Sequence, residues 1–111
     1  MNRKTKEQIA EALFDLNREY QKRNEGFTTW KIQQKRLQKS FSFDDFKQAF
    51  AFMSELAGYA EEVNHHPEWT NVYNRVDIRL YTHDLDGLSE LDFRFAKEVE
   101  DLLLRQDWLS K

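Results

Sequence analysis

Cysteine is absent from this 111-residue chain, and the absence excludes several chemistries together. A chain without thiols has no disulfide, no cysteine nucleophile, no iron–sulfur cluster and no cysteine-ligated zinc. It also has no apolar run approaching the roughly 20 residues of a membrane-spanning helix. The charged N-terminal residues are not followed by the apolar segment of a signal peptide. We therefore expect a soluble, cytoplasmic protein with no membrane partner.

A strong net charge of either sign is missing as well. Lys and Arg number 17 and Asp and Glu number 20, which gives a formal net charge of −3. This balance lacks the overall basic footprint of a nucleic-acid-binding domain. We interpret one local basic run as a solvated hairpin; it consists of Lys31, Lys35, Arg36 and Lys39. With 40% hydrophobic and 14% aromatic residues, the chain is expected to form one folded domain over residues 1–111.

The apolar spacing predicts three helices and two β-hairpins. The first helix covers about 6–22, behind the capping box of Thr5 and Gln8. A hairpin over 27–43, turning within 33–36, precedes a second helix that starts after Asp45 and closes at Asn64. Strands at 69–73 and 76–82 follow, and a third helix opens at 89–92. The order α-β-β-α-β-β-α predicts an α+β fold with a four-stranded antiparallel sheet and three helices on one face.

The three histidines are concentrated in one region. His65 and His66 directly precede the only proline, Pro67, and His83 follows the last predicted strand. Proline disfavours helical backbone at His66, so the rings of His65 and His66 are expected to point to opposite sides. A two-residue loop, Asn74-Arg75, would set Trp69 roughly opposite Thr82. The three imidazoles would then meet at one edge of the sheet.

Three interpretations of this cluster compete. Imidazoles titrate near neutral pH and suit acid–base catalysis on a bound organic substrate. A metal site of His65, His66, His83 and Glu61 is the second, but adjacent residues in extended backbone do not easily turn both rings to one ion. In the third, the histidines only pack.

The carboxylates and tryptophans nearby also have both a structural and a functional interpretation. Asp92 either caps the third helix or lies near His83 and fixes its tautomer. Glu61 is either a helix-end charge or an orienting partner for His65. Trp30 and Trp69 are core or interface residues, or else platforms for a flat heteroaromatic ligand.

An ordered motif surrounds the histidines. It runs from Glu61 through His65-His66-Pro67-Glu68-Trp69 to Asn71-Val72-Tyr73-Asn74, then to Thr82-His83 and Gly87-Leu88-Ser89-Glu90-Leu91-Asp92. Together with Trp30 and the segment 41–50, this set resembles the pterin-4a-carbinolamine dehydratases over residues 27–100. Leu91 departs from the pattern, because some members carry a basic residue there.

The resemblance implies a lyase that dehydrates 4a-hydroxytetrahydropterin to quinonoid dihydropterin, with no metal and no organic cofactor. It implies His65, His66 and His83 as catalytic residues, with His65 and His83 as the acid–base pair. Substrate contacts would come from those histidines, Pro67 and Thr82 to Leu85, Asp84 included. Glu61, Asp92, Trp69 and Trp30 would support the site.

Partners also follow from the resemblance. It implies a homodimer or homotetramer, and a pathway link to an aromatic amino acid hydroxylase whose pterin would be recycled. The apolar tail over 102–109 is expected to join a subunit interface. The alternative function is a non-catalytic interaction module, like the relatives that act as dimerisation cofactor of a transcription factor, or a role in another pterin pathway.

Overall fold

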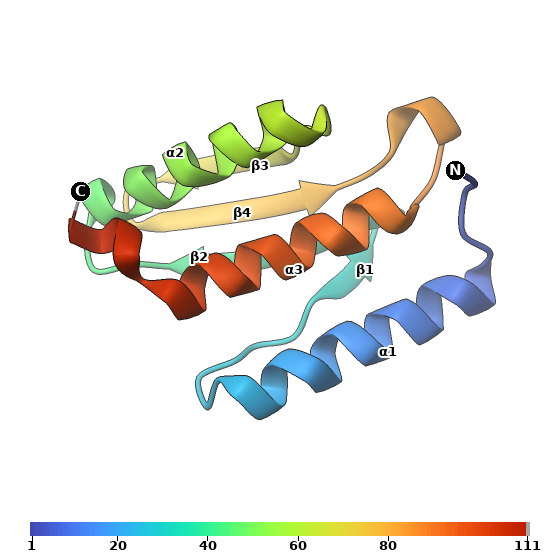
Figure 1. Ribbon diagram of the computed structural model, residues 1–111, viewed down its shortest axis with the longest axis horizontal. Coiled ribbons are helices and arrows are strands. Elements are labelled where there is room, and N and C mark those ends of the chain that lie inside the picture. Colours follow the sequence, from blue (N-terminus) through green and yellow to red (C-terminus); the bar gives the residue numbers. More distant parts are fainter. Residues whose placement is uncertain (111) are drawn as a thin grey trace.

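The computed structural model describes residues 1–110, and it confirms the predicted order of elements. Its helices are α1 (Lys6–Arg23), α2 (Phe46–Val63) and α3 (Glu90–Arg105), and its strands are β1 (Lys31–Gln33), β2 (Arg36–Ser42), β3 (Glu68–Val72) and β4 (Arg75–Leu80). Short 3₁₀ turns cover His83–Leu85 and Asp107–Ser110. The helices lie on one face of the antiparallel sheet, with α1 beside α3 (Figure 1).

The strands follow the order β1-β2-β4-β3, so the last hairpin has β3 at the edge of the sheet. Its register differs from the prediction, because the loop is Tyr73-Asn74 and Trp69 pairs with Ile78 rather than lying near Thr82. Tyr73 takes a positive φ of 51°, and the Asn71 amide donates to the carbonyls of Tyr73 and Arg75. These bonds close the turn one residue earlier than expected. Continued beyond the strand ends, the observed register sets His65 opposite Thr82.

The first hairpin turns at Gln34-Lys35, inside the predicted segment. Both residues have positive φ, 50° and 65°, which is the backbone of a two-residue hairpin turn. Neither is glycine or asparagine, so the turn holds two side chains in a conformation that L-residues disfavour.

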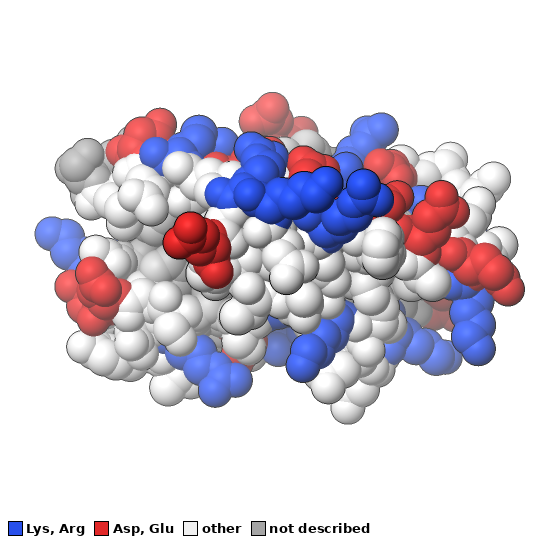
Figure 2. Space-filling view, turned by 90° about the horizontal axis from the view of Figure 1, so that it is seen from below, with Lys and Arg blue, Asp and Glu red and all other residues white. Residues whose placement is uncertain are grey.

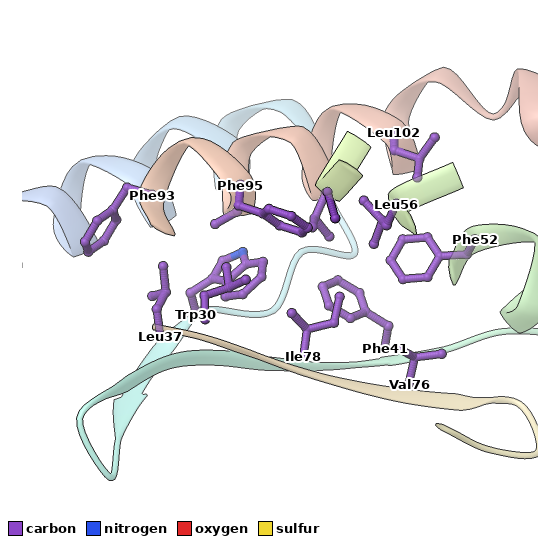
Figure 3. Close-up of a cluster of buried hydrophobic side chains, with 14 of the residues drawn as sticks. Trp30, Leu37, Phe41, Phe52, Leu56, Val76, Ile78, Phe93, Phe95 and Leu102 are labelled. Atoms are coloured by element: carbon purple, nitrogen blue, oxygen red, sulfur yellow. The ribbon is translucent and has the colours of Figure 1, made fainter. Parts of the chain in front are cut away.

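Aromatic and aliphatic side chains fill the space between helices and sheet (Figure 3). Trp30, Phe41 and Phe52 follow one another there in edge or tilted ring contacts. Trp30 is therefore a core residue, and it does not lie among the histidines. The chain's tail adds Trp108, which packs against Phe43 and Phe52 at ring-centre distances of 6.2 and 5.9 Å. The tail thus buries its tryptophan within the chain, and its predicted role in a subunit interface stays a prediction.

One residue of the basic run is not solvated, so the hairpin interpretation is wrong for Lys39. Lys39 shares the inward face of β2 with Leu37 and Phe41 and is only 9% exposed. Its Nζ lies 2.6 Å from Oε2 of Glu100 on α3, which also accepts from Nε1 of Trp30 at 2.9 Å. A buried cation is tolerated when it is paired and hydrogen-bonded in this way. Side chains along β2 point alternately inward and outward, and this alternation, rather than the neighbouring charges, determines that Lys39 points into the core.

The face of the molecule on the side of α1 carries charges of both signs (Figure 2). Seen from the side of α1, Lys, Arg, Asp and Glu side chains are interspersed around an uncharged stretch (Figure 2). Among the described residues, no helix is both long and apolar enough to cross a membrane.

Candidate active site

The end of α2 determines where His65 lies. Asn64 closes the helix, as predicted, and it does so in the left-handed conformation with φ of 53°. The His65 amide donates to the Ala60 carbonyl at 3.1 Å. The chain then leaves the helix and passes through Pro67 into β3. His65 is only 8% exposed, and its Nε2 lies 2.7 Å from Oδ1 of Asp92.

Asp92 is fully buried and serves two structural purposes. Its Oδ2 accepts from the Ser89 amide at 2.9 Å, which forms half of the capping box of α3. The same oxygen accepts from the Thr82 hydroxyl at 2.8 Å, while Oδ1 faces His65. The ionised Asp92 carboxylate can only accept hydrogen bonds, so Nε2 of His65 carries the proton and donates to it. The lone pair of the neutral ring is then on Nδ1.

Asp92 caps α3, which confirms one of its two predicted roles, and the imidazole that it contacts is His65 rather than His83. The register of β3 and β4 is the reason, because its continuation sets His65 opposite Thr82, whose hydroxyl donates to Asp92. Glu61, predicted as either a helix-end charge or a partner of His65, lies in the last turn of α2 and contacts His66 instead. Its Oε2 lies 2.5 Å from Nε2 of His66 rather than near His65, and this pair is exposed to solvent.

His83 begins the 3₁₀ turn after β4, and its side chain is 62% exposed. Its Nε2 lies 3.2 Å from Oε2 of Glu68, and its ring meets the Tyr81 ring edge-on at 5.0 Å. All three histidines thus face a carboxylate through Nε2, namely Asp92, Glu61 and Glu68 respectively.

Sequence reasoning missed Glu68 and its partner Arg36. Arg36 Nε lies 2.8 Å from Oε1 of Glu68, and Nη2 lies 3.2 Å from Oε2. These hydrogen bonds, more than the added attraction of His83, hold the pKa of Glu68 below its usual value. Glu68 lies one residue after Pro67, within the histidine motif, and this position was the signal for it in the sequence. Arg36 lies 32 residues away, and no local pattern could have paired them.

The remaining predicted residues lie around this edge of the sheet. Thr82 is buried and closes the loop through its amide, which donates to the Gly87 carbonyl at 3.0 Å. Asp84 is exposed, and Pro67 and Leu85 are half-buried. Trp69 packs partly against the core. Within residues 1–110 no group of three or more His, Asp or Glu side chains is arranged to hold a metal ion.

The arrangement is suited to moving protons. A buried imidazole with a carboxylate on one nitrogen can accept or donate a proton at the other, as acid–base catalysis requires. A second imidazole, His83, follows directly after Thr82, which shares the Asp92 carboxylate with His65. The site therefore offers two imidazoles on one sheet edge, one sheltered and one open to solvent.

The chain is similar to known proteins of one family. The family model described as pterin 4 alpha carbinolamine dehydratase matches residues 3–102. A protein of Synechococcus sp. (strain WH7803), provisionally named pterin-4-alpha-carbinolamine dehydratase, is 51% identical over 73 residues, which are 66% of this chain and 78% of that protein. A protein of Rhizobium leguminosarum bv. trifolii (strain WSM2304) with the same provisional name is 54% identical over 70 residues, 63% of this chain and 69% of its own.

Solved structures agree with this placement. The transcriptional coactivator/pterin dehydratase from Brucella melitensis has a TM-score of 0.77 and 39% identity, covering 91% of this chain and 98% of its own. A pterin dehydratase-like protein, a RuBisCO assembly factor in the alpha-carboxysome, has a TM-score of 0.59 and 32% identity, covering 68% and 89%. The chain belongs to the pterin 4 alpha carbinolamine dehydratase family.

Proposed function

We propose that this protein catalyses the dehydration of a 4a-hydroxytetrahydropterin to quinonoid dihydropterin and water. The observation that carries the proposal is the buried pair of His65 and Asp92, 2.7 Å apart, beside Thr82 and His83. A substrate held at this edge of the sheet would find one imidazole of fixed orientation and a second that solvent can reprotonate. Membership of the family supports the choice of a pterin as substrate.

The reaction needs two proton transfers and no redox change. One imidazolium donates a proton to the hydroxyl on C4a, and the C4a–O bond breaks as water leaves. The other imidazole accepts the proton of N5, whose electron pair forms the C4a=N5 double bond. One proton is given and one is taken, so the net charge of the protein does not change. Proton exchange with solvent then returns each ring to its starting protonation state. Each positioned transfer contributes about 10²–10⁴ in rate.

We assign the two transfers to His65 and His83 together. His65 has its Nε2 engaged by Asp92, so Nδ1 is the nitrogen that would face the substrate. His66 is exposed and paired with Glu61, which suits substrate binding better than a central proton transfer. We expect His66→Ala to raise KM more than it lowers kcat.

The residues around the histidines would hold the pterin. Pro67, Thr82, His83, Asp84 and Leu85 come from the two segments that meet at this edge, and a ring bound between them would contact both. Positioning of the substrate must supply much of the acceleration that the imidazoles do not.

Turnover of freshly generated 4a-carbinolamine tests the proposal. Wild-type protein should accelerate dehydration over the buffer rate, and His65→Ala and His83→Ala should each lower kcat by about 10²-fold or more. Gln21→Ala on the exposed side of α1 is the control and should match wild type. A dehydration rate with wild-type protein equal to the rate in buffer alone would exclude the dehydratase activity.

The second candidate function is protein binding. The RuBisCO assembly factor with a similar fold supports it, as do the neighbouring rings of Phe46 and Phe50, which are exposed on α2. An interaction module would lack turnover and would be unaffected by His65→Ala with His83→Ala. A homodimer or homotetramer and a link to an aromatic amino acid hydroxylase pathway are further parts of the proposal, and light scattering tests the first of these.

A further inference from the structure

Arg36 and Glu68 form a two-point contact beside His83. The guanidinium presents Nε and Nη2 to the two oxygens of the Glu68 carboxylate, at 2.8 and 3.2 Å. This fork geometry determines the plane of the carboxylate as well as its position, which a lysine ammonium could not do. Oε2, the oxygen that meets Nη2, is also the oxygen 3.2 Å from Nε2 of His83.

Arg36 is itself held in place. Its guanidinium lies over the Tyr81 ring, 4.3 Å from the ring centre, and its Nη1 donates to the Gln34 carbonyl at 3.2 Å. Tyr81 falls opposite Arg36 in the continued β2–β4 register, and its hydroxyl donates to Asp86. The guanidinium is thus fixed from two sides, by the turn of the first hairpin and by the loop after β4.

The same two groups reach His83. Glu68 contacts its Nε2, and the Tyr81 ring meets its imidazole edge-on at 5.0 Å. Without them, a side chain that is 62% exposed would be free to sample several rotamers. His65, in contrast, is already fixed by burial.

We propose that Glu68, clamped by Arg36, is the positioning residue that holds His83 with Nε2 engaged and Nδ1 turned to the substrate. This inference rests on the proposed dehydratase function, and it adds two residues to the site. Arg36 and Glu68 act through His83 and do not touch the reacting atoms. The arrangement on His83 then repeats that on His65, where Asp92 engages Nε2.

The orientation of the His83 ring can be measured without any substrate. In wild-type protein, nuclear Overhauser contacts between the ring protons of Tyr81 and His83 should be strong, since the ring centres are 5.0 Å apart. Glu68→Ala should abolish them, and so should Arg36→Leu. The matched control is Arg79→Leu, because Arg79 is a nearby cation that attracts Glu68 but donates its hydrogen bond to Thr70. It should leave the contacts unchanged.

Kinetics of the same variants give the second readout. Loss of orientation should lower kcat by about 10- to 100-fold in Glu68→Ala and in Arg36→Leu, with KM little changed. Arg79→Leu should keep the wild-type kcat. Thermal unfolding of each variant checks that the fold is retained, and Arg36→Lys serves where Arg36→Leu does not fold.

The two readouts separate this inference from the proposed function. Tyr81–His83 contacts that persist in both Glu68→Ala and Arg36→Leu would overturn the positioning role, whether or not the wild type turns over the carbinolamine. Contacts that are lost while kcat stays at the wild-type value would overturn it too. If wild type shows no turnover, the dehydratase proposal fails alone, and the nuclear Overhauser result still decides whether Glu68 and Arg36 orient the ring.

Discussion

Nε2 of His65 lies 2.7 Å from Oδ1 of Asp92, and both side chains are buried. The carboxylate also accepts from Thr82 and from the amide that starts α3, so a single buried group joins the histidine loop, the end of β4 and the third helix. Orientation of the imidazole and integrity of the fold therefore depend on the same residue.

Asp92→Asn separates charge from shape at this position. The amide has one acceptor oxygen and a donating NH₂ group, so it cannot accept from His65, Thr82 and Ser89 together. We expect kcat to fall by about 10²–10⁴-fold and the free energy of unfolding to drop by about 1–3 kcal/mol. Steady-state kinetics and urea unfolding measure the two effects. Glu90→Gln, an exposed acid in the same helical turn, is the control. A wild-type kcat in Asp92→Asn would contradict the role of the pair.

The contact of Arg36 with Glu68 predicts a pH dependence of stability. Because Arg36 holds the pKa of Glu68 below its ordinary value of 4.5, the folded protein favours the ionised carboxylate. The stabilisation is therefore present above pH 4.5 and is lost as the pH falls through the lower folded pKa. For this partly exposed pair it amounts to about 0.5 kcal/mol.

Urea unfolding of wild type and Glu68→Gln at several pH values measures this effect. The stability difference between the two proteins should be largest at neutral pH and should shrink towards about pH 3. A difference that grows on acidification would mean that the carboxylate is not favoured by its contacts in the folded state.

Local patterns predicted most of the fold, because its signals are local. The capping boxes of Thr5 and Ser89, and the left-handed Asn64, depend on neighbours within a few residues. The pairing of Asp92 with His65 and of Glu68 with His83 does not depend on near neighbours. Asp92 could be recognised as a cap from the sequence, but its imidazole partner depended on a β3–β4 register that was predicted with the turn one residue too far along.

Burial against a distant element was the other source of error. Lys39 looks like a surface lysine within its own segment, and its buried counter-charge, Glu100, lies 61 residues away. Sequence reasoning likewise had no means of joining Arg36 to Glu68 across β4. The candidate site was found as a cluster, while its internal contacts required the folded structure.

The buried pair of Lys39 and Glu100 predicts a strongly non-additive double mutant. Glu100→Gln leaves Lys39 buried without a counter-charge and should cost about 3–5 kcal/mol of unfolding free energy. Adding Lys39→Met removes the stranded cation, while the amide oxygen introduced by Glu100→Gln can still accept from Trp30, so stability should be partly restored. Urea denaturation of the wild type and of the single and double variants measures this. A double mutant less stable than Glu100→Gln would refute the interpretation.

Burial also lowers the pKa of Lys39 from 10.5, against the opposing effect of Glu100. The folded state therefore disfavours the charged amine, and its contribution to stability should improve as the pH rises from the folded pKa towards 10.5. The improvement should be visible as a stability difference between wild type and Lys39→Met that changes in the wild type's favour at alkaline pH.

The turn at Gln34-Lys35 offers a stabilising substitution. Both residues have positive φ, and Asn followed by Gly is the pair that this turn prefers. Gln34→Asn with Lys35→Gly should raise the free energy of unfolding by about 1 kcal/mol, seen as a higher melting temperature. Lys31→Gly, in the adjacent strand β1, should lower it. If the Asn-Gly variant is less stable than wild type, the side chains of Gln34 and Lys35 stabilise the fold by more than their positive-φ backbone destabilises it.

Dehydration of freshly generated 4a-carbinolamine is the most direct test of the proposed activity. Its rate should be measured with wild type, His65→Ala, His83→Ala and the Gln21→Ala control under the same conditions. The structure leads us to expect wild type and Gln21→Ala to accelerate the reaction equally, and each histidine variant to be slower by about 10²-fold or more. A rate that is the same in all four proteins would contradict acid–base catalysis by His65 and His83.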